Sequence, residues 1–518
     1  RQGGGRAELP SLRLANLVAL RHPLSVDTYV EQTLTGAKAI LVRLIGGVSY
    51  WSYGVQHLRA LAQEKGMALA ILPADGRVDP QLDAASTLPL PVLRRLAHLC
   101  DTGGAVAAKA ALEELARAAG LFSAPETGPV SETVTGAETL PATGAWSPER
   151  GVYDPLDLPP ASRPRIVLSF YRSYLVAADT APIEALLRAF AARGYECIAL
   201  FAPSLKAAGA ADWLRARIRH LAPDAIVNAT AFSGRGAGGA DGEESASPLD
   251  VGEVPVFQVA LSTARRKAWA DSERGLSAGD LAMHVVLPEV DGRLMGGVVS
   301  FKEPERSDPE LQYARFAHRP EPERIAAVVA RVDGWLKLAR CAVFERRVAL
   351  ILSTYPGKDW NMGHAVGLDA PASALAMLED LKGAGYDVSQ APEDLTQALG
   401  ARSVSFSLAD YHAALARLPE SLQEALEATW GAPETDAACR DGAFHFAAIR
   451  LGKQWIALQP ERGSAEQARA EEYHDLSRTP RHAYVAFYLW LQSRCDALVH
   501  IGAHGTLEWL PGKSVALS

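Results

Sequence analysis

The feature that most constrains the fold is a strand–helix–glycine–strand pattern that occurs three times. Each copy has a short apolar stretch, an amphipathic helix, a glycine and a second apolar stretch, and the copies span 39–72, 165–201 and 348–388. The glycines are Gly66, Gly194 and Gly385, placed where a helix favours a left-handed residue after its last turn. A helix that joins two parallel strands has this signature. The pattern predicts an α/β protein with several doubly wound, Rossmann- or flavodoxin-like parallel-sheet domains, joined by helical segments and long loops.

The length and the breaks between these units predict the domain organisation. With 518 residues, the chain is expected to contain roughly three to four domains. We predict an N-terminal α/β domain at 1–122, a Pro/Gly-rich linker at 123–164, a second α/β domain at 165–320, a helical connector at 321–344 and a third α/β region at 345–518. Ser233–Pro248 is glycine- and acid-rich, which predicts a mobile loop with no ligand role.

Composition excludes several classes of protein. The chain has 52 basic and 60 acidic residues and a net charge of −8, so a dominant nucleic-acid surface is not expected. Its five cysteines form no C-x-x-C pair, which argues against a disulfide scaffold and favours a reducing cytoplasm. No apolar run approaches the ~20 residues of a membrane span. We therefore expect a cytoplasmic protein that binds neither nucleic acid nor membrane.

Two formal nucleotide motifs lack the context that they need. Gly234, Gly236 and Gly239 match G-x-G-x-x-G, but acidic residues and a proline follow, where a dinucleotide site requires a helix. Gly512-Lys513-Ser514 resembles the end of a P-loop, but the first glycine of that motif is replaced by Leu507. The sequence predicts no nicotinamide or flavin site and no P-loop for ATP.

The strongest candidate site combines His500, His504 and Glu508, which recur every four residues. Gly502 and Gly505 would break a helix, and the apolar run before them indicates a strand end followed by a loop, where α/β sheets place ligands. Two imidazoles and a carboxylate suit a divalent metal or proton transfer near neutral pH. The alternative is a packed core histidine and a solvated acid, and the residues alone leave the two interpretations about even.

Other polar residues follow predicted strands and form weaker candidates. The segment after 348–352 has amides and a cation suited to a carboxylate- or amide-bearing ligand, but an ordinary polar loop explains it as well. Two further segments and the end of the 165–169 strand are similarly ambiguous between a site and a turn or cap. These candidates are Tyr355, Lys358, Asn361 and Gly363; Gln459 and Arg462; His474 with Asp475; and Tyr171, Arg172, Ser173 and Asp179.

The long motif from His500 to Lys513 resembles the signature of the large cobaltochelatase subunit, which shares a family with the H-type subunit of magnesium chelatase. The segments Leu352–Ala374, Leu287–Gly292, Ser169–Pro182, Gln459–Gly463 and Pro480–Tyr488 resemble the same family. Thr506, Trp509 and Leu510 fit the cobalt branch better than the magnesium branch. The likeness extends from roughly Leu14 to Ser518, and family members are about twice this length, so we expect an N-terminal portion in which 345–518 begins the catalytic body.

This resemblance implies a subunit that binds a tetrapyrrole and inserts Co²⁺ into hydrogenobyrinic acid a,c-diamide on the aerobic route to cobalamin. It implies that ATP-Mg²⁺ is used only by two partner subunits, one of them an AAA+ ATPase. Glu508, His504 and His500 would be the catalytic residues and would hold Co²⁺ transiently. The implied substrate contacts are Tyr355, Lys358, Asn361, Gly363, Gln459, Arg462, His474, His482 and Lys513.

Three alternatives to this function stay open. The first is a magnesium chelatase H-type subunit that acts on protoporphyrin IX. The second is a tetrapyrrole-binding protein without chelatase turnover. The third is a metallohydrolase that holds zinc with His500, His504 and Glu508.

Overall fold

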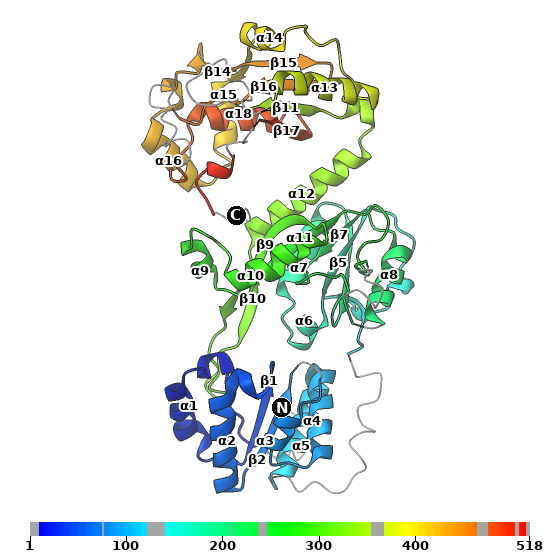
Figure 1. The fold of residues 1–518 in the computed structure, drawn as a ribbon, viewed down its shortest axis with the longest axis vertical. Coiled ribbons are helices and arrows are strands. Elements are labelled where there is room, and N and C mark those ends of the chain that lie inside the picture. Colours follow the sequence, from blue (N-terminus) through cyan, green and yellow to red (C-terminus); the bar gives the residue numbers. More distant parts are fainter. Residues whose placement is uncertain are drawn as a thin grey trace. The chain divides into compact units, whose positions relative to one another are not determined.

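The computed structural model describes residues 10–74, 77–121, 140–207, 209–236, 246–353, 367–463, 475–502 and 507–513. The chain forms two compact units (Figure 1). Unit 1 comprises Arg1–Arg266 and Ala278–Ala326, and unit 2 comprises Lys267–Ser277 and Ala327–Ser518. The chain thus leaves unit 1 for eleven residues before it passes finally into unit 2. The finer predicted division into five segments stays a prediction.

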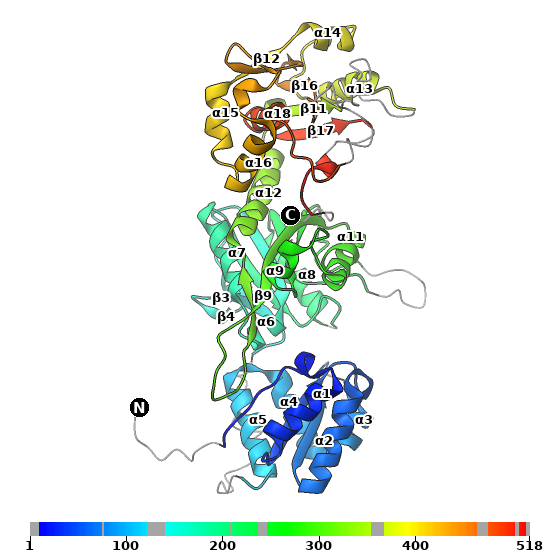
Figure 2. The same cartoon turned by 90° about the vertical axis from the view of Figure 1, so that its left-hand side faces the viewer.

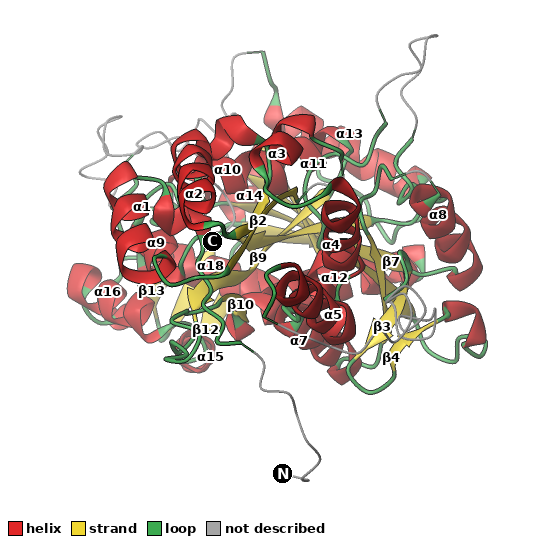
Figure 3. Ribbon diagram, turned by 90° about the horizontal axis from the view of Figure 1, so that it is seen from below, coloured by secondary structure: helices red, strands yellow, loops and turns green. Residues whose placement is uncertain are grey.

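Unit 1 begins with the first predicted strand–helix–strand copy. β1 (Ala39–Leu44) and β2 (Ala68–Pro73) pair in parallel through α2 (Ser52–Lys65), and Gly66 ends α2 with φ 65°. Alternate strand side chains face opposite layers. Ile40, Val42 and Ile71 pack towards α2, and Ala70 and Leu72 pack towards the paired helices α4 and α5. Figure 3 shows α2 and the α4–α5 pair on opposite sides of β2. The helices around this pair are α1 (Pro23–Tyr29), α3 (Pro80–Ala85), α4 (Leu90–Thr102) and α5 (Gly104–Ala118).

The second copy lies inside a larger sheet in the same unit. β5 (Arg165–Tyr171) and β6 (Glu196–Ala202) pair in parallel through α7 (Ala181–Ala192), and Gly194 has φ 87°. The described residues of this sheet form eight strands in the order β10-β9-β8-β7-β5-β6-β3-β4. Its other strands are β3 (Gly144–Ser147), β4 (Gly151–Tyr153), β7 (Ala225–Asn228), β8 (Val256–Ser262), β9 (Leu294–Pro304) and β10 (Phe316–Pro320). The strands β9, β8, β7, β5 and β6 are parallel, which confirms the α/β class predicted from the pattern.

Short helices complete unit 1, and one long helix leads out of it. The helical segments of unit 1 are α6 (Arg172–Val176), α8 (Ala210–Leu221), α10 (Ala278–Leu281) and α11 (Leu287–Val290). The helix α9 (Arg266–Asp271) begins at the last residue of unit 1 and continues into the 267–277 segment of unit 2. α12 (Pro322–Arg340) occupies most of the segment that was expected to be helical at 321–344. The boundary between the two units falls within α12, after Ala326.

Unit 2 is built on a sheet in the order β15-β16-β11-β17. β11 (Val348–Leu352) lies in parallel between β16 (Gln454–Leu458) and β17 (Ala497–Ile501), and β15 (Ala448–Leu451) is antiparallel to β16. Leu350 and Leu352 face α13 (Ala370–Gly383) and α14 (Leu395–Ala401). Ala349 and Ile351 pack against α18 (His482–Gln492) instead. Figure 2 shows α18 beside β11 and β17.

The third predicted copy is only partly correct. β11, α13 and the left-handed Gly385 form as expected, but the predicted strand at 386–388 does not. The carbonyl of Asp387 instead accepts hydrogen bonds from Lys453 N (3.0 Å) and Gln454 Nε2 (3.2 Å), at the turn between β15 and β16. These hydrogen bonds hold residues 386–388 at the turn between β15 and β16, outside the sheet. The strand that pairs with β11 is β16.

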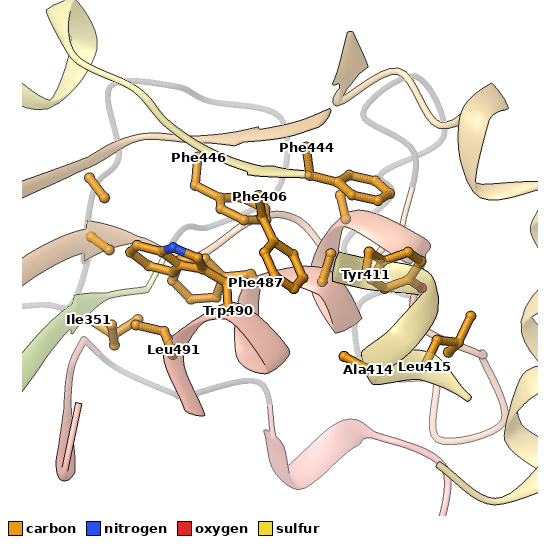
Figure 4. Packing of buried hydrophobic residues seen from close by; sticks show 14 of the residues in the cluster. Ile351, Phe406, Tyr411, Ala414, Leu415, Phe444, Phe446, Phe487, Trp490 and Leu491 are labelled. Atoms are coloured by element: carbon orange, nitrogen blue, oxygen red, sulfur yellow. The ribbon is translucent and has the colours of Figure 1, made fainter. Parts of the chain in front are cut away.

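The aromatic core of unit 2 covers the α18 face of this sheet. Trp490, 1% exposed, contacts the rings of Phe446 and Phe487 at centroid distances of 5.8 and 6.0 Å (Figure 4). It also contacts the ring of Trp455 at 5.1 Å. The elements around it are β12 (Val404–Ser407), β13 (Cys439–Arg440), β14 (Ala443–Phe446), α15 (Leu408–Leu415) and α16 (Glu420–Trp430). This core fixes α18, and with it the tyrosines that α18 brings to the sheet edge.

Candidate functional site

The carboxyl ends of three parallel strands of unit 2 meet at one edge. Gln459 N, directly after β16, donates to Leu352 O of β11 at 2.9 Å. Ser353 N, directly after β11, donates to Ile501 O of β17 at 3.1 Å. The three loops that carried most of the candidates therefore leave the sheet side by side, at the edge where open α/β sheets bind ligands.

Several candidates on these loops lie outside the described residues. They are Tyr355, Lys358, Asn361 and Gly363 after β11, His474 after β16, and His504 after β17. Glu508 lies in a short 3-10 turn, η10 (Leu507–Trp509), whose backbone is described while the Glu508 side chain is not. The joint His500, His504 and Glu508 set therefore stays a prediction.

His500 is half-buried on β17, one residue before the strand ends. Its Nε2 lies 3.2 Å from the hydroxyl of Tyr488, and the two rings meet edge to face at 6.0 Å. The hydroxyl acts as donor or acceptor according to the imidazole tautomer, so Tyr488 is able to follow a change in the proton on His500. This contact suits a histidine that shares or transfers a proton.

Two tyrosines of α18 connect the strand ends, and the sequence reasoning missed both. Gln459, 2% exposed, donates from Nε2 to the Tyr484 hydroxyl at 3.0 Å. Tyr484 and Tyr488 are four residues apart on one helix face, with their rings 5.0 Å apart. Through these two tyrosines, α18 contacts Gln459 after β16 and His500 on β17. The signal that was available is the i, i+4 tyrosine pair in the helix that precedes the motif.

Arg462 lies at the same edge, but it contacts the chain itself. It is 3% exposed and donates from its two terminal nitrogens to the backbone carbonyls of Trp509 and Asp475, the latter at 2.8 Å. The Arg462 carbonyl accepts from Arg481 N at 3.0 Å. Arg462 therefore ties the loop after β16 to the turn that contains Glu508.

Lys513 also contacts backbone carbonyls. Its ammonium group donates to the carbonyls of Ala270 and Ser272, the latter at 2.7 Å, and lies 4.9 Å from the centroid of the Trp269 ring. These partners belong to the 267–277 segment, the excursion of the chain into unit 2.

His482, at the start of α18, is buried away from solvent with 2% exposure. Its Nε2 lies 2.9 Å from Gly431 O, and because a carbonyl only accepts, Nε2 carries the proton. In the neutral imidazole its Nδ1 then accepts from the Tyr411 hydroxyl, at 2.7 Å. Both ring nitrogens bind protein groups, which favours a structural role over the predicted substrate contact.

A partly buried ion pair fixes the same end of α18. The Asp436 carboxylate accepts from Arg481 and from the backbone N–H of Ala438 (2.9 Å) and Ala483 (3.1 Å). Burial acts to raise the pKa of Asp436, but these hydrogen bonds outweigh it and hold the pKa below its ordinary value. The charge also complements the positive end of the α18 dipole.

The flanks of the glycine-rich Ser233–Pro248 segment are held in place, so the expectation of a wholly mobile segment is wrong there. Asp291, 6% exposed, accepts from Ser233 Oγ and from Gly234 N, each at 2.6 Å. A side chain added at Gly234 would lie 2.5 Å from Ser247 Oγ. Residues 237–245 lie outside the described residues. The Asp291 carboxylate thus accepts the hydrogen bond of the Gly234 N–H, a group that a dinucleotide site would offer to a phosphate. This contact argues against a dinucleotide site at these glycines.

The residues predicted after the 165–169 strand serve local structure. The Tyr171 hydroxyl donates to Ala231 O at 2.6 Å, and Arg172 donates to the carbonyls of Pro141 and Thr102 at 2.8 and 2.7 Å. Asp179, 5% exposed, accepts from His318 N at 2.8 Å. Ser173 accepts Ala177 N through its carbonyl at 2.9 Å, as a helix residue does. These contacts favour caps over a ligand site.

A buried polar cluster in unit 1 was not anticipated. Asp280, fully buried, accepts from the hydroxyls of Ser262 and Thr263 at 2.7 and 2.8 Å. His318, 4% exposed, contacts Ser300 Oγ at 3.1 Å. Burial lowers the pKa of His318 to about 4, against the opposing effect of Asp179, and burial also lowers the pKa of His284. Both imidazoles are therefore neutral near pH 7.

We expect unit 1 to lose stability as the pH falls from about 6.5 to about 4. In that range His318 takes up a proton in the unfolded chain but stays neutral in the folded chain. The difference lowers the free energy of unfolding by about 3 kcal/mol at pH 4. His318→Gln keeps a hydrogen-bond partner for Ser300 but has no group that titrates in this range. The decrease in stability between pH 7 and pH 4.5, measured as the shift of the urea unfolding midpoint, should therefore be smaller in this variant. His220→Gln, an exposed histidine on α8, is the control. An unchanged slope in His318→Gln would contradict this assignment.

Two features are absent from the part of the chain that the structure describes. Across the described ranges, no three or more His, Cys, Asp and Glu side chains come together as a metal site. Within the same ranges, no helix combines the length and the apolar character needed to cross a membrane.

The sequence comparisons point to one family. Residues 110–518 match the CobN/magnesium chelatase family. The aerobic cobaltochelatase subunit CobN of Sinorhizobium sp. is 36% identical over 98% of this chain and 41% of its own length. The same subunit of Pseudomonas aeruginosa is 38% identical over 99% of this chain and 41% of its own length. The H-type subunit of magnesium chelatase from Rhodobacter capsulatus is 28% identical over 73% of this chain and 34% of its own length.

A solved structure agrees with these relatives. The catalytic subunit of cobaltochelatase from Mycobacterium tuberculosis superposes with a TM-score of 0.66 and 27% sequence identity, over 96% of this chain and 41% of that chain. The chain therefore spans about two fifths of the length of the cobaltochelatase relatives that it matches.

Proposed function

Because the chain belongs to the CobN/magnesium chelatase family, we propose that it is the tetrapyrrole-binding, metal-inserting part of a cobaltochelatase. The observation that carries the choice of cobalt is the identity of 36–38% over nearly the whole chain to two cobaltochelatase subunits, against 28% over 73% of the chain to a magnesium chelatase subunit. The proposed substrates are Co²⁺ and hydrogenobyrinic acid a,c-diamide. ATP is hydrolysed by two partner subunits, one an AAA+ ATPase, in the cytoplasm.

The proposed chemistry follows from what metallation requires. Two pyrrolic protons must leave the macrocycle as the dication enters, so the site needs proton acceptors that also bind a borderline metal. Glu508, His504 and His500 are the proposed acceptors and transient metal ligands. The Tyr488 hydroxyl, 3.2 Å from His500 Nε2, gives that histidine a partner in either tautomer. Tyr355, Lys358, Asn361, Gly363, His474 and Gln459 are the proposed substrate contacts.

The binding step can be tested on the complete subunit without its partners. Titration with hydrogenobyrinic acid a,c-diamide and, separately, protoporphyrin IX should show tighter binding of the former by about tenfold or more, or about 1.4 kcal/mol. Absorbance of the macrocycle is the measurement. Tighter binding of protoporphyrin IX would favour a magnesium chelatase H-type subunit, and tight stoichiometric zinc in the purified protein would favour a metallohydrolase.

The complete subunit alone is expected not to hydrolyse ATP. The P-loop match at Lys513 is incomplete, and the Lys513 ammonium group is engaged by the carbonyls of Ala270 and Ser272. Phosphate release by the repurified subunit should stay at the level of a buffer blank until the partners are added. Intrinsic ATP turnover that Lys513→Ala abolishes would contradict this division of labour.

A further inference from the structure

We propose that Arg462 and Lys513 are positioning residues that hold the Glu508 turn at the sheet edge, and that neither binds substrate carboxylates. The inference concerns the residues of the proposed metal-inserting site, so its kinetic part rests on the proposed function. Its structural part, the anchoring of residues 507–513, does not.

The turn needs support from outside itself. η10 has three residues, and a backbone hydrogen bond from Leu510 N to Leu507 O at 3.2 Å closes it. A single 3-10 turn has too few internal bonds to offset the entropy of ordering its backbone. A catalytic carboxylate, however, must be held to within a fraction of an ångström to work efficiently. Contacts from other elements must therefore fix this turn.

Arg462 supplies the first contact. Its guanidinium donates to the Trp509 carbonyl inside the turn and to the Asp475 carbonyl beyond the loop after β16. A planar guanidinium that binds two carbonyls holds both in a defined relation, which a flexible ammonium group does not. With 3% of the residue exposed, Arg462 offers almost no surface to a macrocycle carboxylate. Its charge is used to join two backbone segments.

Lys513 supplies the second contact, four residues after Trp509. The Lys513 ammonium group lies over the Trp269 ring and donates hydrogen bonds to the carbonyls of Ala270 and Ser272, all in the 267–277 segment. At Gly275, φ is +92°, and an added Cβ would lie 3.3 Å from Lys513 Cβ and 3.4 Å from Trp269 Nε1. The close approach and the left-handed backbone both favour glycine at this position. The turn is thus held on one side by the loop after β16 and on the other by the 267–277 segment.

Hydrogen exchange of the complete subunit tests the anchoring without any assay of activity. In Arg462→Gln, peptides covering 507–513 should exchange roughly tenfold faster than in the wild type. The reason is that the turn can then open without breaking the hydrogen bonds that the Arg462 guanidinium makes in the wild type. Arg346→Gln is the matched control, since Arg346 also donates to two backbone carbonyls, of Cys341 and Ala339, but at the amino end of β11. It should leave exchange at 507–513 unchanged. Unchanged exchange in Arg462→Gln would overturn the proposal.

Lys513→Gln keeps the test decisive if Arg462→Gln folds poorly. Exchange at 507–513 should rise, and Lys453→Gln, which removes a lysine 5.1 Å from the Phe344 ring centroid, should have no effect there. Equal exchange in Lys513→Gln and wild type would overturn the role of Lys513.

Kinetics then separate positioning from substrate binding. Loss of positioning should lower kcat for cobalt insertion about 10- to 100-fold in Arg462→Gln, with KM for the macrocycle within about twofold. The double variant with Arg462→Gln and Glu508→Gln should insert cobalt no more slowly than Glu508→Gln alone, since both changes act through the Glu508 carboxylate. A raised KM with normal kcat would identify Arg462 as a substrate contact and overturn the proposal. If the wild type inserts no metal, the proposed function fails, and the exchange experiment still decides the anchoring.

Discussion

Glu508→Gln is expected to lower the rate of cobalt insertion by about 10²–10⁴, the range for a lost general base. The amide keeps the shape and hydrogen-bonding capacity of the side chain but accepts no proton and binds a dication poorly. Affinity for the macrocycle should change by no more than about threefold, because the polyanionic substrate gains nothing from a nearby carboxylate. The measurements are cobalt insertion with both partner subunits and ATP, and equilibrium binding of the macrocycle.

The matched control is Glu427→Gln, which removes an exposed carboxylate from α16 in the same unit. It should insert cobalt at the wild-type rate. His504→Ala should resemble Glu508→Gln, whereas Lys358→Ala should mainly raise KM, since a cation that meets substrate carboxylates acts in ground and transition states alike. Near-normal insertion by Glu508→Gln would remove Glu508 from the catalytic residues and leave η10 as a structural turn.

Trp490→Ala should destabilise unit 2 by about 3–5 kcal/mol, the usual cost of truncating a buried tryptophan. The side chain is 1% exposed and packs edge to face on Trp455 at 5.1 Å, so its loss leaves a large cavity between α18 and the sheet. Urea unfolding followed by hydrogen exchange of the β11 and α18 peptides measures the loss. Met377→Ala, at 36% exposure on α13, should cost about 0.5 kcal/mol or less. Comparable losses in the two variants would show that this core does not support α18.

The sequence predicted most of the local architecture correctly because its signals are local. The apolar stretches at β1, β5 and β11 form strands, buried in β5 and β11 and alternately buried in β1, and Gly66, Gly194 and Gly385 all adopt positive φ after a helix. The strand predicted at 386–388 failed for a non-local reason. Whether a short apolar stretch joins a sheet depends on which partner wins the hydrogen bonds, and β16 pairs with β11 from about a hundred residues further along the chain.

The position of the candidate site could be predicted from the sequence, but the partners of its side chains within the chain could not. The ends of β11, β16 and β17 do meet, as the placement of the candidates after strands suggested. However, Arg462, Lys513 and His482 all direct polar atoms at protein groups. A sequence shows that a side chain carries a charge or a ring nitrogen, but it does not show whether the chain itself supplies the partner.

The residues that were missed have weak sequence signals. Tyr484 and Tyr488 lie in an aromatic helix that also supplies Phe487 and Trp490 to the core, so the two tyrosines at the site edge do not stand out from their neighbours. The Asp280 and His318 cluster draws on segments between β8 and β10, and only the folded sheet brings them into one buried layer.

Cobalt insertion by the complete subunit tests the central proposal most directly. The subunit is mixed with hydrogenobyrinic acid a,c-diamide, Co²⁺, both partner subunits and ATP, and the macrocycle spectrum is followed over time. The proposal predicts conversion to the cobalt complex that stops when the subunit, a partner or ATP is omitted, and that Glu508→Gln slows by at least about a hundredfold. Binding of the macrocycle with no cobalt complex formed, under these full conditions, would contradict it and leave a tetrapyrrole-binding protein without chelatase turnover.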